Sequence, residues 1–282
     1  MRRADTKADG MGEADMSTGT EENFTNEDRR QLTVRNLTIG KGIPKICVPL
    51  TGITQEEILT EAGRLEQFPA DLAEWRVDWY AQAKDVAAVL ETLKKLRAAL
   101  GEMPLLFTFR TKKEGGQADI GQEEYLLLNE TAIRSGDADL IDAELFMGEE
   151  TLRQLTEEAH RYSVKVIASS HDFEKTPTKE EIIRRLCRMQ QLNADILKIA
   201  VMPKCKADVL ALLAATEEMD TRYARRPVVT MSMGAQGMIS RLCGELTGSS
   251  MTFGTVGKSS APGQVPIKDL AEILTHIHRS MK

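Results

Sequence analysis

Lys198 lies in the middle of a short apolar run, residues 194–202, and its amine is a candidate reactive group. Such a run predicts a buried strand of a parallel sheet, whose successive side chains point to opposite faces. Lys198 then shares the inner face with Ile196, Ala200 and Met202. A charged ammonium is costly to bury, so the lysine must pair with a carboxylate or lose its proton. A neutral amine is a nucleophile for ketones, whereas a structural ion pair is the ordinary alternative.

Polar side chains also interrupt other apolar stretches of the chain. Glu74, Arg76 and Asp78 alternate with Trp75, Val77 and Trp79, which predicts that the two sets lie on opposite faces of a strand. Later stretches contain Thr108 with Arg110, Asp142 with Glu144, and His171 after residues 164–170.

Each of these residues alone has an ordinary explanation, such as a structural ion pair or a loop histidine. Asp142 and Glu144 are interpreted mainly as ion-pair partners or orienting groups. Taken together, however, the stretches place acids, arginines, a histidine and a lysine at comparable heights on adjacent strands. This concentration of charge favours a functional site over a packed apolar interior.

Two late segments add groups that suit an anion. Residues 231–241 read as a strand, a glycine-containing turn and a helix carrying Arg241, and residues 257–264 form a loop with Ser260 and Gln264. Glycines alone are weak indicators, but late loops of a barrel commonly bind phosphate. The loop at 257–264 is therefore interpreted as an anion cradle or a lid, mobile when empty.

The elements that must position these residues alternate regularly between strands and helices. We predict strands at residues 43–50, 72–79, 104–111, 140–145, 164–170, 194–202, 227–233 and 251–255. We predict helices at residues 54–65, 85–100, 122–135, 149–162, 178–192, 206–219, 235–243 and 267–281, the first capped by Thr51 or Thr54. Eight such pairs predict an α/β fold, a single (β/α)₈ TIM barrel of the usual size of about 250 residues. An open doubly wound sheet is the competing fold, and it is disfavoured because no GxGxxG follows an early strand.

The termini and the composition set the remaining boundaries. Residues 1–36 are polar and lack periodicity, which predicts a largely disordered extension, and residues 37–282 are assigned to the barrel domain. Residues 32–39 alternate well enough for a short strand or hairpin that covers one end of the barrel. The net charge of −6 argues against nucleic acid as the main partner, and no apolar run reaches the roughly 18 residues of a membrane span. A cytoplasmic protein is the default expectation.

The cysteines and histidines give no metal-binding spacing. Cys47, Cys187, Cys205 and Cys243 form no CxxC motif, and His276 and His278 do not share a helix face. We expect no metal, and we expect the cysteines to be reduced and mostly buried.

The motifs together resemble the type I 3-dehydroquinate dehydratases, the Schiff-base enzymes of the shikimate pathway. The resemblance rests on residues 74–78, 109–116, 169–173, 198–203, 231–241 and 260–264, which occur in family order and span residues 35–282. It implies that Lys198 forms an imine with the substrate ketone, that His171 is the general acid and base, and that Glu114 orients His171. It also implies that Arg241 pairs with the substrate carboxylate. The remaining implied substrate-binding residues are Glu74, Arg76, Arg110, Ser260 and Gln264.

The chemistry implied by the resemblance fits these side chains. A protonated imine acidifies the neighbouring carbon, so that a histidine can remove its proton and assist departure of a hydroxyl. The resemblance implies no metal or dissociable cofactor, 3-dehydroquinate as the small-molecule partner, and a homodimer. A class I aldolase, which would need an anchored phosphate, and a non-catalytic metabolite sensor are the alternative functions.

Overall fold

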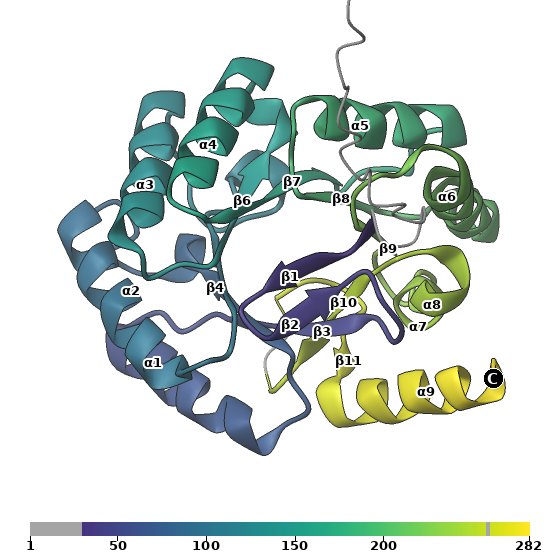
Figure 1. Ribbon diagram of the computed structural model, residues 1–282, viewed down its shortest axis with the longest axis horizontal. Helices are drawn as coiled ribbons and strands as arrows, with labels where there is room; N and C mark the ends of the chain where they lie inside the picture. Colours follow the sequence, from purple (N-terminus) through teal and green to yellow (C-terminus); the bar gives the residue numbers. More distant parts are fainter. Residues whose placement is uncertain (1–29, 258–259) are drawn as a thin grey trace, which may run out of the picture.

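A closed barrel of parallel strands surrounded by helices forms the body of the protein (Figure 1). This computed structural model describes residues 30–257 and 260–282. The strands of the barrel are β3 (Lys45–Leu50), β4 (Leu72–Arg76), β5 (Leu105–Thr108), β6 (Leu140–Glu144), β7 (Lys165–Asp172), β8 (Ile196–Val201), β9 (Val228–Ser232) and β10 (Met251–Thr255). Strands β3 to β9 pair in chain order, and β10 pairs with β3. A bridge between Val228 in β9 and Ser249, just before β10, closes the barrel. The predicted fold is confirmed.

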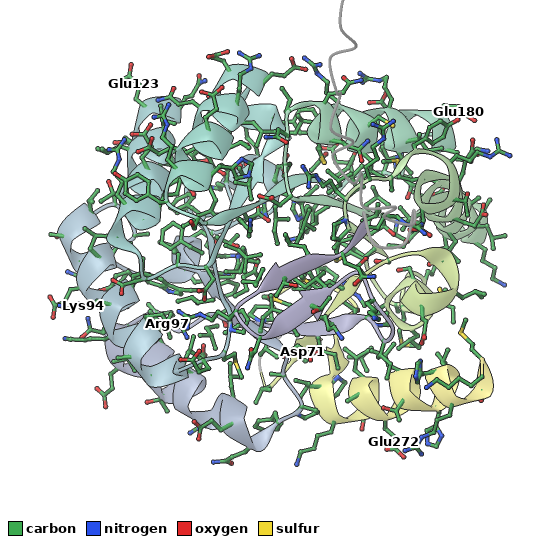
Figure 2. All side chains as sticks on the ribbon, viewed as in Figure 1. Asp71, Lys94, Arg97, Glu123, Glu180 and Glu272 are labelled. Carbon is green, nitrogen blue, oxygen red and sulfur yellow. The ribbon has the colours of Figure 1, made fainter. Side chains whose placement is uncertain are left out.

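The helices follow the strands in alternation. They are α1 (Gln55–Arg64), α2 (Val86–Leu100), α3 (Gln122–Ser135), α4 (Glu149–Arg161), α5 (Lys179–Gln191), α6 (Lys206–Glu218), α7 (Ile239–Leu242), α8 (Gly244–Thr247) and α9 (Ile267–Ser280). A two-residue strand, β11 (Val265–Pro266), pairs with β10 before α9 begins. Figure 2 shows the labelled helix residues Lys94, Glu123, Glu180 and Glu272 at the outer rim of the ring, as expected for solvated helix faces.

The side chains of the strands form two separate apolar cores. The outward residues, such as Leu197, Ile199 and Val201, pack with the helices, whereas Ile196 and Ala200 lie in a second cluster inside the barrel. The predicted assignment of faces in the lysine strand is therefore confirmed. The first inward residue of most strands is apolar, and several inward residues nearer the C-terminal ends, such as Glu74, Asp142 and Lys198, are polar. The inner core thus supplies an apolar floor beneath a polar layer.

A short antiparallel hairpin covers the N-terminal end of the barrel. It consists of β1 (Leu32–Val34) and β2 (Leu37–Ile39), and it crosses the middle of the ring in Figure 1. Its buried residues Val34 and Ile39 join the inner core. The hairpin expected from the alternation at residues 32–39 is confirmed, and β1 lies inside the segment assigned to the extension. The predicted disorder of residues 1–29 falls outside the described residues.

Three aspartates fasten the N-terminal ends of neighbouring strands. Asp71, Asp139 and Asp195, just before β4, β6 and β8, accept the backbone N–H groups of Ile46, Leu105 and Val166 at 2.7, 2.8 and 2.9 Å. Asp139 also pairs with Arg35 in the hairpin turn and with Arg97 in α2. These bonds satisfy backbone donors at the strand starts, so this end of the barrel serves stability while the opposite end is left for chemistry.

Several element boundaries differ from those expected. β4 ends at Arg76 and a 3₁₀ turn, Val77–Trp79, follows, so that Asp78 is not a strand residue. β5 ends at Thr108, two residues before Arg110, whereas β7 continues through His171 to Asp172. The helix expected at 235–243 is instead two short helices, α7 and α8, preceded by a turn. Asp78, just after β4, accepts the backbone N–H groups of Arg110 and Gln117, and such contacts between loops are not revealed by periodicity.

The first helix begins at one of the two expected caps. Thr54 accepts the N–H of Glu57 at 3.2 Å, and the Glu57 side chain accepts the Thr54 N–H in return. This reciprocal pair satisfies two of the free donors at the helix start.

The four cysteines are unpaired, as expected, but fewer of them are buried than expected. Among the described residues only Cys47 is fully buried, and Cys205 at the start of α6 is exposed. The expectation that most of the cysteines are buried was wrong, because Cys187 and Cys243 are only half-buried and Cys205 is exposed.

Candidate active site

A pocket opens at the C-terminal ends of the barrel strands. It is lined by every one of the candidate residues taken from the sequence: Glu74, Arg76, Arg110, Glu114, His171, Lys198, Arg241, Ser260 and Gln264. These residues come from β4, β7, β8 and α7 and from the segments after β5 and β10. The parallel strands therefore bring together side chains that lie up to 190 positions apart in the chain.

Lys198 lies at the base of this pocket and is almost completely buried, with 4% of the residue exposed. Its Nζ atom donates to Asp142 Oδ2 at 3.2 Å and lies 3.9 Å from Glu74 Oε1. The Phe253 ring covers the amine, with Nζ 4.5 Å from the ring centroid. Of the two expected states, a carboxylate pair or a lost proton, the structure shows the carboxylate pair. Lys198 nevertheless lines the same pocket as His171 and Arg241.

Arg110 lies among three buried acidic side chains. Its guanidinium lies 2.7 Å from Glu144, 2.8 Å from Asp142 and 3.6 Å from Glu114. Burial alone would lower the pKa of Arg110, but the surrounding negative charges raise it well above its usual value. Arg110 is therefore a permanent cation whose charge is already neutralised by the protein.

His171 is held by Glu114 through two bonds. Glu114 Oε2 lies 2.8 Å from His171 Nδ1 and accepts the backbone N–H of His171 at 3.0 Å. This arrangement fixes the ring and leaves Nε2 as the ring nitrogen that can serve the pocket.

The charges around this pair favour the uncharged form of each group. Burial, and then the positive charges of Arg110 and Lys198, lower the pKa of His171 well below its usual range. Burial and the negative charge of Glu144 raise the pKa of Glu114 to about 9. His171 is thus an unprotonated imidazole at neutral pH, which is the state that a base requires.

Arg241 is a buried cation of a different kind. Its guanidinium contacts Met231 Sδ at 3.6 Å and the Pro262 carbonyl at 3.1 Å, and its Nε atom has no hydrogen-bond partner within the described chain. Burial lowers the pKa of Arg241 to about 10, and no carboxylate of the described residues compensates for this loss of solvation. An unneutralised guanidinium in a pocket is suited to an anionic ligand.

Glu74 and Arg76 are fixed by neighbouring side chains at the wall of the pocket. Arg76 forms a two-point ion pair with Asp78, both bonds being 2.8 Å, and Glu74 accepts the Thr108 hydroxyl at 2.9 Å. Asp78 also accepts the backbone N–H of Gln117 at 3.0 Å. These bonds set the orientation of Arg76 and Glu74 before any ligand arrives.

The segment after β10 contributes Ser260 and Gln264. The Gln264 side chain accepts the Ser260 N–H at 2.9 Å and donates to the Ser260 hydroxyl at 3.0 Å. Gly263 has a φ of 77°, and a Cβ atom there would lie 2.4 Å from the Gly234 carbonyl, so this approach between the two loops requires glycine. Residues 258 and 259 lie outside the described chain, and the anion cradle or lid stays a prediction.

The sequence reasoning missed the apolar half of the pocket. Phe173, Met231, Met233 and Phe253 also line it, together with Gly115, Ala200 and Ala261. The alternation of β9 and β10 could have placed Met231 and Phe253 inward, but apolar inward residues are expected of any barrel and gave no distinguishing signal. Among the described residues, no group of three acidic, histidine or cysteine side chains is arranged for a metal ion. Nor does any described helix combine the length and apolarity needed to cross a membrane.

The fold and the pocket define a (β/α)₈-barrel enzyme with a buried lysine in its lumen. The family model for type I 3-dehydroquinase matches residues 46–281, and the chain belongs to this family. It is 50% identical over 253 residues to the 3-dehydroquinate dehydratase of Clostridium botulinum, covering 90% of this chain and all of that protein. It is 54% identical over 243 residues to the enzyme of Klebsiella pneumoniae, covering 86% of this chain and 97% of that protein.

Solved structures agree with the assignment. The type I 3-dehydroquinate dehydratase of Clostridium difficile, described with covalently modified comenic acid, is 50% identical and superposes with a TM-score of 0.87. The match covers 89% of this chain and 99% of that one. The enzyme of Geobacillus kaustophilus is 40% identical, also with a TM-score of 0.87, over 90% of this chain and 98% of that one. The resemblance inferred from the sequence is confirmed, and with it the hydro-lyase class of the enzyme.

Proposed function

We propose that the pocket dehydrates 3-dehydroquinate to 3-dehydroshikimate through an imine on Lys198. The observation that carries this proposal is the convergence of a buried amine, an imidazole held by a buried carboxyl group, and a buried arginine that pairs with no carboxylate of the described residues. The family assignment supplies the reaction, and the geometry of the pocket supports a role for each residue.

The reaction begins with Lys198. Its amine must first lose its extra proton, because only the uncharged amine can attack the ketone carbon. Water then leaves, and a protonated imine forms. Two carboxylates lie within 4 Å of Nζ, at 3.2 and 3.9 Å, and Glu74 faces the pocket. Glu74 is therefore the group placed to take this proton.

His171 then moves the proton that makes dehydration possible. It removes the proton from the carbon beside the imine, and the electron pair of the broken C–H bond flows toward the imine nitrogen. The resulting enamine expels the hydroxyl on the next carbon, and His171 returns its proton to the departing oxygen. Hydrolysis of the product imine releases Lys198. The lowered pKa of His171 keeps the ring ready as a base at the start of each cycle.

Arg241 is the residue we assign to the substrate carboxylate. Arg76 and Arg110 are already neutralised by protein carboxylates, so Arg241 carries the uncompensated charge. Arg76 and Arg110, together with Glu74, Ser260 and Gln264, are left to position the hydroxyls and to assist carboxylate binding. A carboxylate at Arg241 would restore the solvation that the buried guanidinium has lost.

Arg241→Ala is expected to raise KM by about 30-fold or more, because a buried charge pair with the substrate is lost. Turnover should fall less, since the reacting groups are untouched. Steady-state kinetics with 3-dehydroquinate measures both quantities. Arg222→Ala is the matched control, because Arg222 is largely exposed and pairs with Glu218 outside the pocket. Unchanged KM in Arg241→Ala would contradict the assignment of the carboxylate.

The reaction itself is tested by following the ultraviolet absorbance of the conjugated enone after the protein is mixed with 3-dehydroquinate. A rise in absorbance is expected. No rise with authentic substrate would remove the proposed dehydration and leave a class I aldolase or a metabolite sensor as the alternatives. An aldolase would instead cleave a carbon–carbon bond of a phosphorylated sugar.

We also propose that two copies of the chain pack through the surface of α6, α7 and α8. Helices α6 and α8 contact each other, and α6, α7 and α8 carry the exposed apolar side chains Leu210, Ile239 and Leu246. Exposed large apolar side chains are typical of a protein interface. Sedimentation equilibrium should give twice the chain mass, and a monomer at micromolar concentration would contradict the proposal.

A further inference from the structure

Asp142 is a buried carboxylate for which the reaction as described gives no role. Its side chain is fully buried, and it lies beneath Lys198 without lining the pocket. Three groups converge on it: the Lys198 amine at 3.2 Å, the Arg110 guanidinium at 2.8 Å and the Ser169 hydroxyl at 2.5 Å. Asp142 is thus the carboxylate closest to the atom that becomes the imine nitrogen.

The surroundings of Asp142 make it a stable anion and a weak base. Burial alone would raise the pKa of Asp142, but the charges of Arg110 and Lys198 and the bond from Ser169 outweigh burial and lower it. A carboxylate in this state attracts a neighbouring positive charge without readily accepting a proton from it.

We propose that Asp142 is the fixed counter-ion of the imine nitrogen, and that Arg110 and Ser169 keep it from removing the proton on that nitrogen. This inference rests on the proposed function, because it concerns the imine on Lys198. Dehydration needs the imine to be protonated, since a neutral imine is a much poorer acceptor of electrons. A negative charge 3.2 Å from Nζ, shielded from water, favours the protonated form throughout the cycle.

The proposed step balances without any proton transfer to Asp142. His171 takes the C–H proton, the electron pair forms the new carbon–carbon double bond, and the former imine π pair becomes the lone pair on nitrogen. When the hydroxyl leaves with the proton from His171, that lone pair returns to form the product imine. The N–H bond persists in both steps, while the charge on nitrogen disappears and reappears beside Asp142.

Two neighbouring groups, Glu74 and Phe253, are less suited to this role than Asp142. Glu74 lies farther from Nζ, at 3.9 Å, and faces the pocket, where it can exchange protons with substrate and water. The Phe253 ring, 4.5 Å from Nζ, also favours a cation there, but it carries no net charge. The geometry therefore assigns the counter-ion to Asp142 and leaves proton exchange to Glu74.

The test measures how the protonation of the imine depends on pH. Cyanoborohydride reduces protonated imines in preference to neutral ones, so the rate of adduct formation with 3-dehydroquinate reports the protonated fraction. In the unmodified protein this rate should stay level from neutral to alkaline pH. In Asp142→Asn the imine pKa should fall by about one unit or more, so that trapping at alkaline pH is about tenfold slower or worse. Glu74→Gln is the matched control and should shift the profile less.

Ser169→Ala tests the counter-ion role of Asp142 if Asp142→Asn misfolds or forms no adduct. This variant keeps the Asp142 charge but removes one of its donors, so Asp142 becomes more basic and shares the imine proton; trapping should therefore be slower at every pH, without a shift of the profile to lower pH. Profiles in the variants that match the unmodified protein would overturn the counter-ion. Absence of any adduct in the unmodified protein would instead overturn the proposed function, which keeps the two failures distinct.

Discussion

Lys198→Ala is expected to reduce turnover by about four orders of magnitude or more, the scale seen when a covalent nucleophile is removed. Without the amine, the ketone remains the only electron acceptor, and the proton beside it is far less acidic. The pocket retains its other groups, so substrate binding should persist. The measurements are the enone assay at high enzyme concentration and a direct binding titration with 3-dehydroquinate.

A covalent label locates the nucleophile independently of rate. Borohydride added with 3-dehydroquinate should leave one adduct, and peptide mass analysis should place it on Lys198. Lys179 provides the control lysine, because it is partly exposed and pairs with Glu218 at 2.7 Å outside the pocket. Lys179→Ala should keep full labelling, whereas Lys198→Ala should lose it. An adduct mapped to any other lysine would refute the assignment of Lys198.

His171→Ala should lower turnover by about 10²-fold or more, which is the usual contribution of a general acid and base. Imine formation depends on Lys198, so this variant should still be labelled by borohydride in the presence of substrate. The combination of slow turnover with retained labelling distinguishes loss of the proton carrier from collapse of the pocket. Wild-type turnover in His171→Ala would remove the histidine from the mechanism.

The pH profile gives a second test of the same residue. His171 must be neutral to act as a base, and its pKa in the free enzyme is lowered well below the usual value near 6.5 by burial, Arg110 and Lys198. Accordingly, kcat/KM should remain level as the pH falls through the usual histidine range and should decline only at lower pH. This decline should be absent from the residual activity of His171→Ala. A decline centred at the ordinary histidine pKa would contradict the buried, charge-surrounded imidazole.

Much of the fold was fixed by local patterns in the sequence. Eight apolar runs with intervening helical patterns predicted the barrel, and the alternation around Lys198 correctly placed that residue inward with Ile196 and Ala200. Side-chain direction within a strand depends on its own backbone alone, so it can be read without knowing the partners. The ends of the strands were less predictable, as at Arg76 and Arg110, because contacts between loops decide where a strand stops.

The candidate residues were named from the sequence because their motifs resembled a known family. The tertiary structure placed all of them in one pocket, which the order of residues along the chain does not require.

The sequence by itself determined which side chains point into the barrel and which chemical groups are present there. Only the tertiary structure decided how those groups share their charges: Arg110 is neutralised by Asp142 and Glu144, Arg241 by none of the described residues, and Lys198 pairs with Asp142. The physical reason is that the two properties depend on interactions over different distances along the chain. The direction of a side chain follows from the geometry of its own strand, whereas ion pairing depends on the register between distant strands and on competition among all the charges that meet in one buried space.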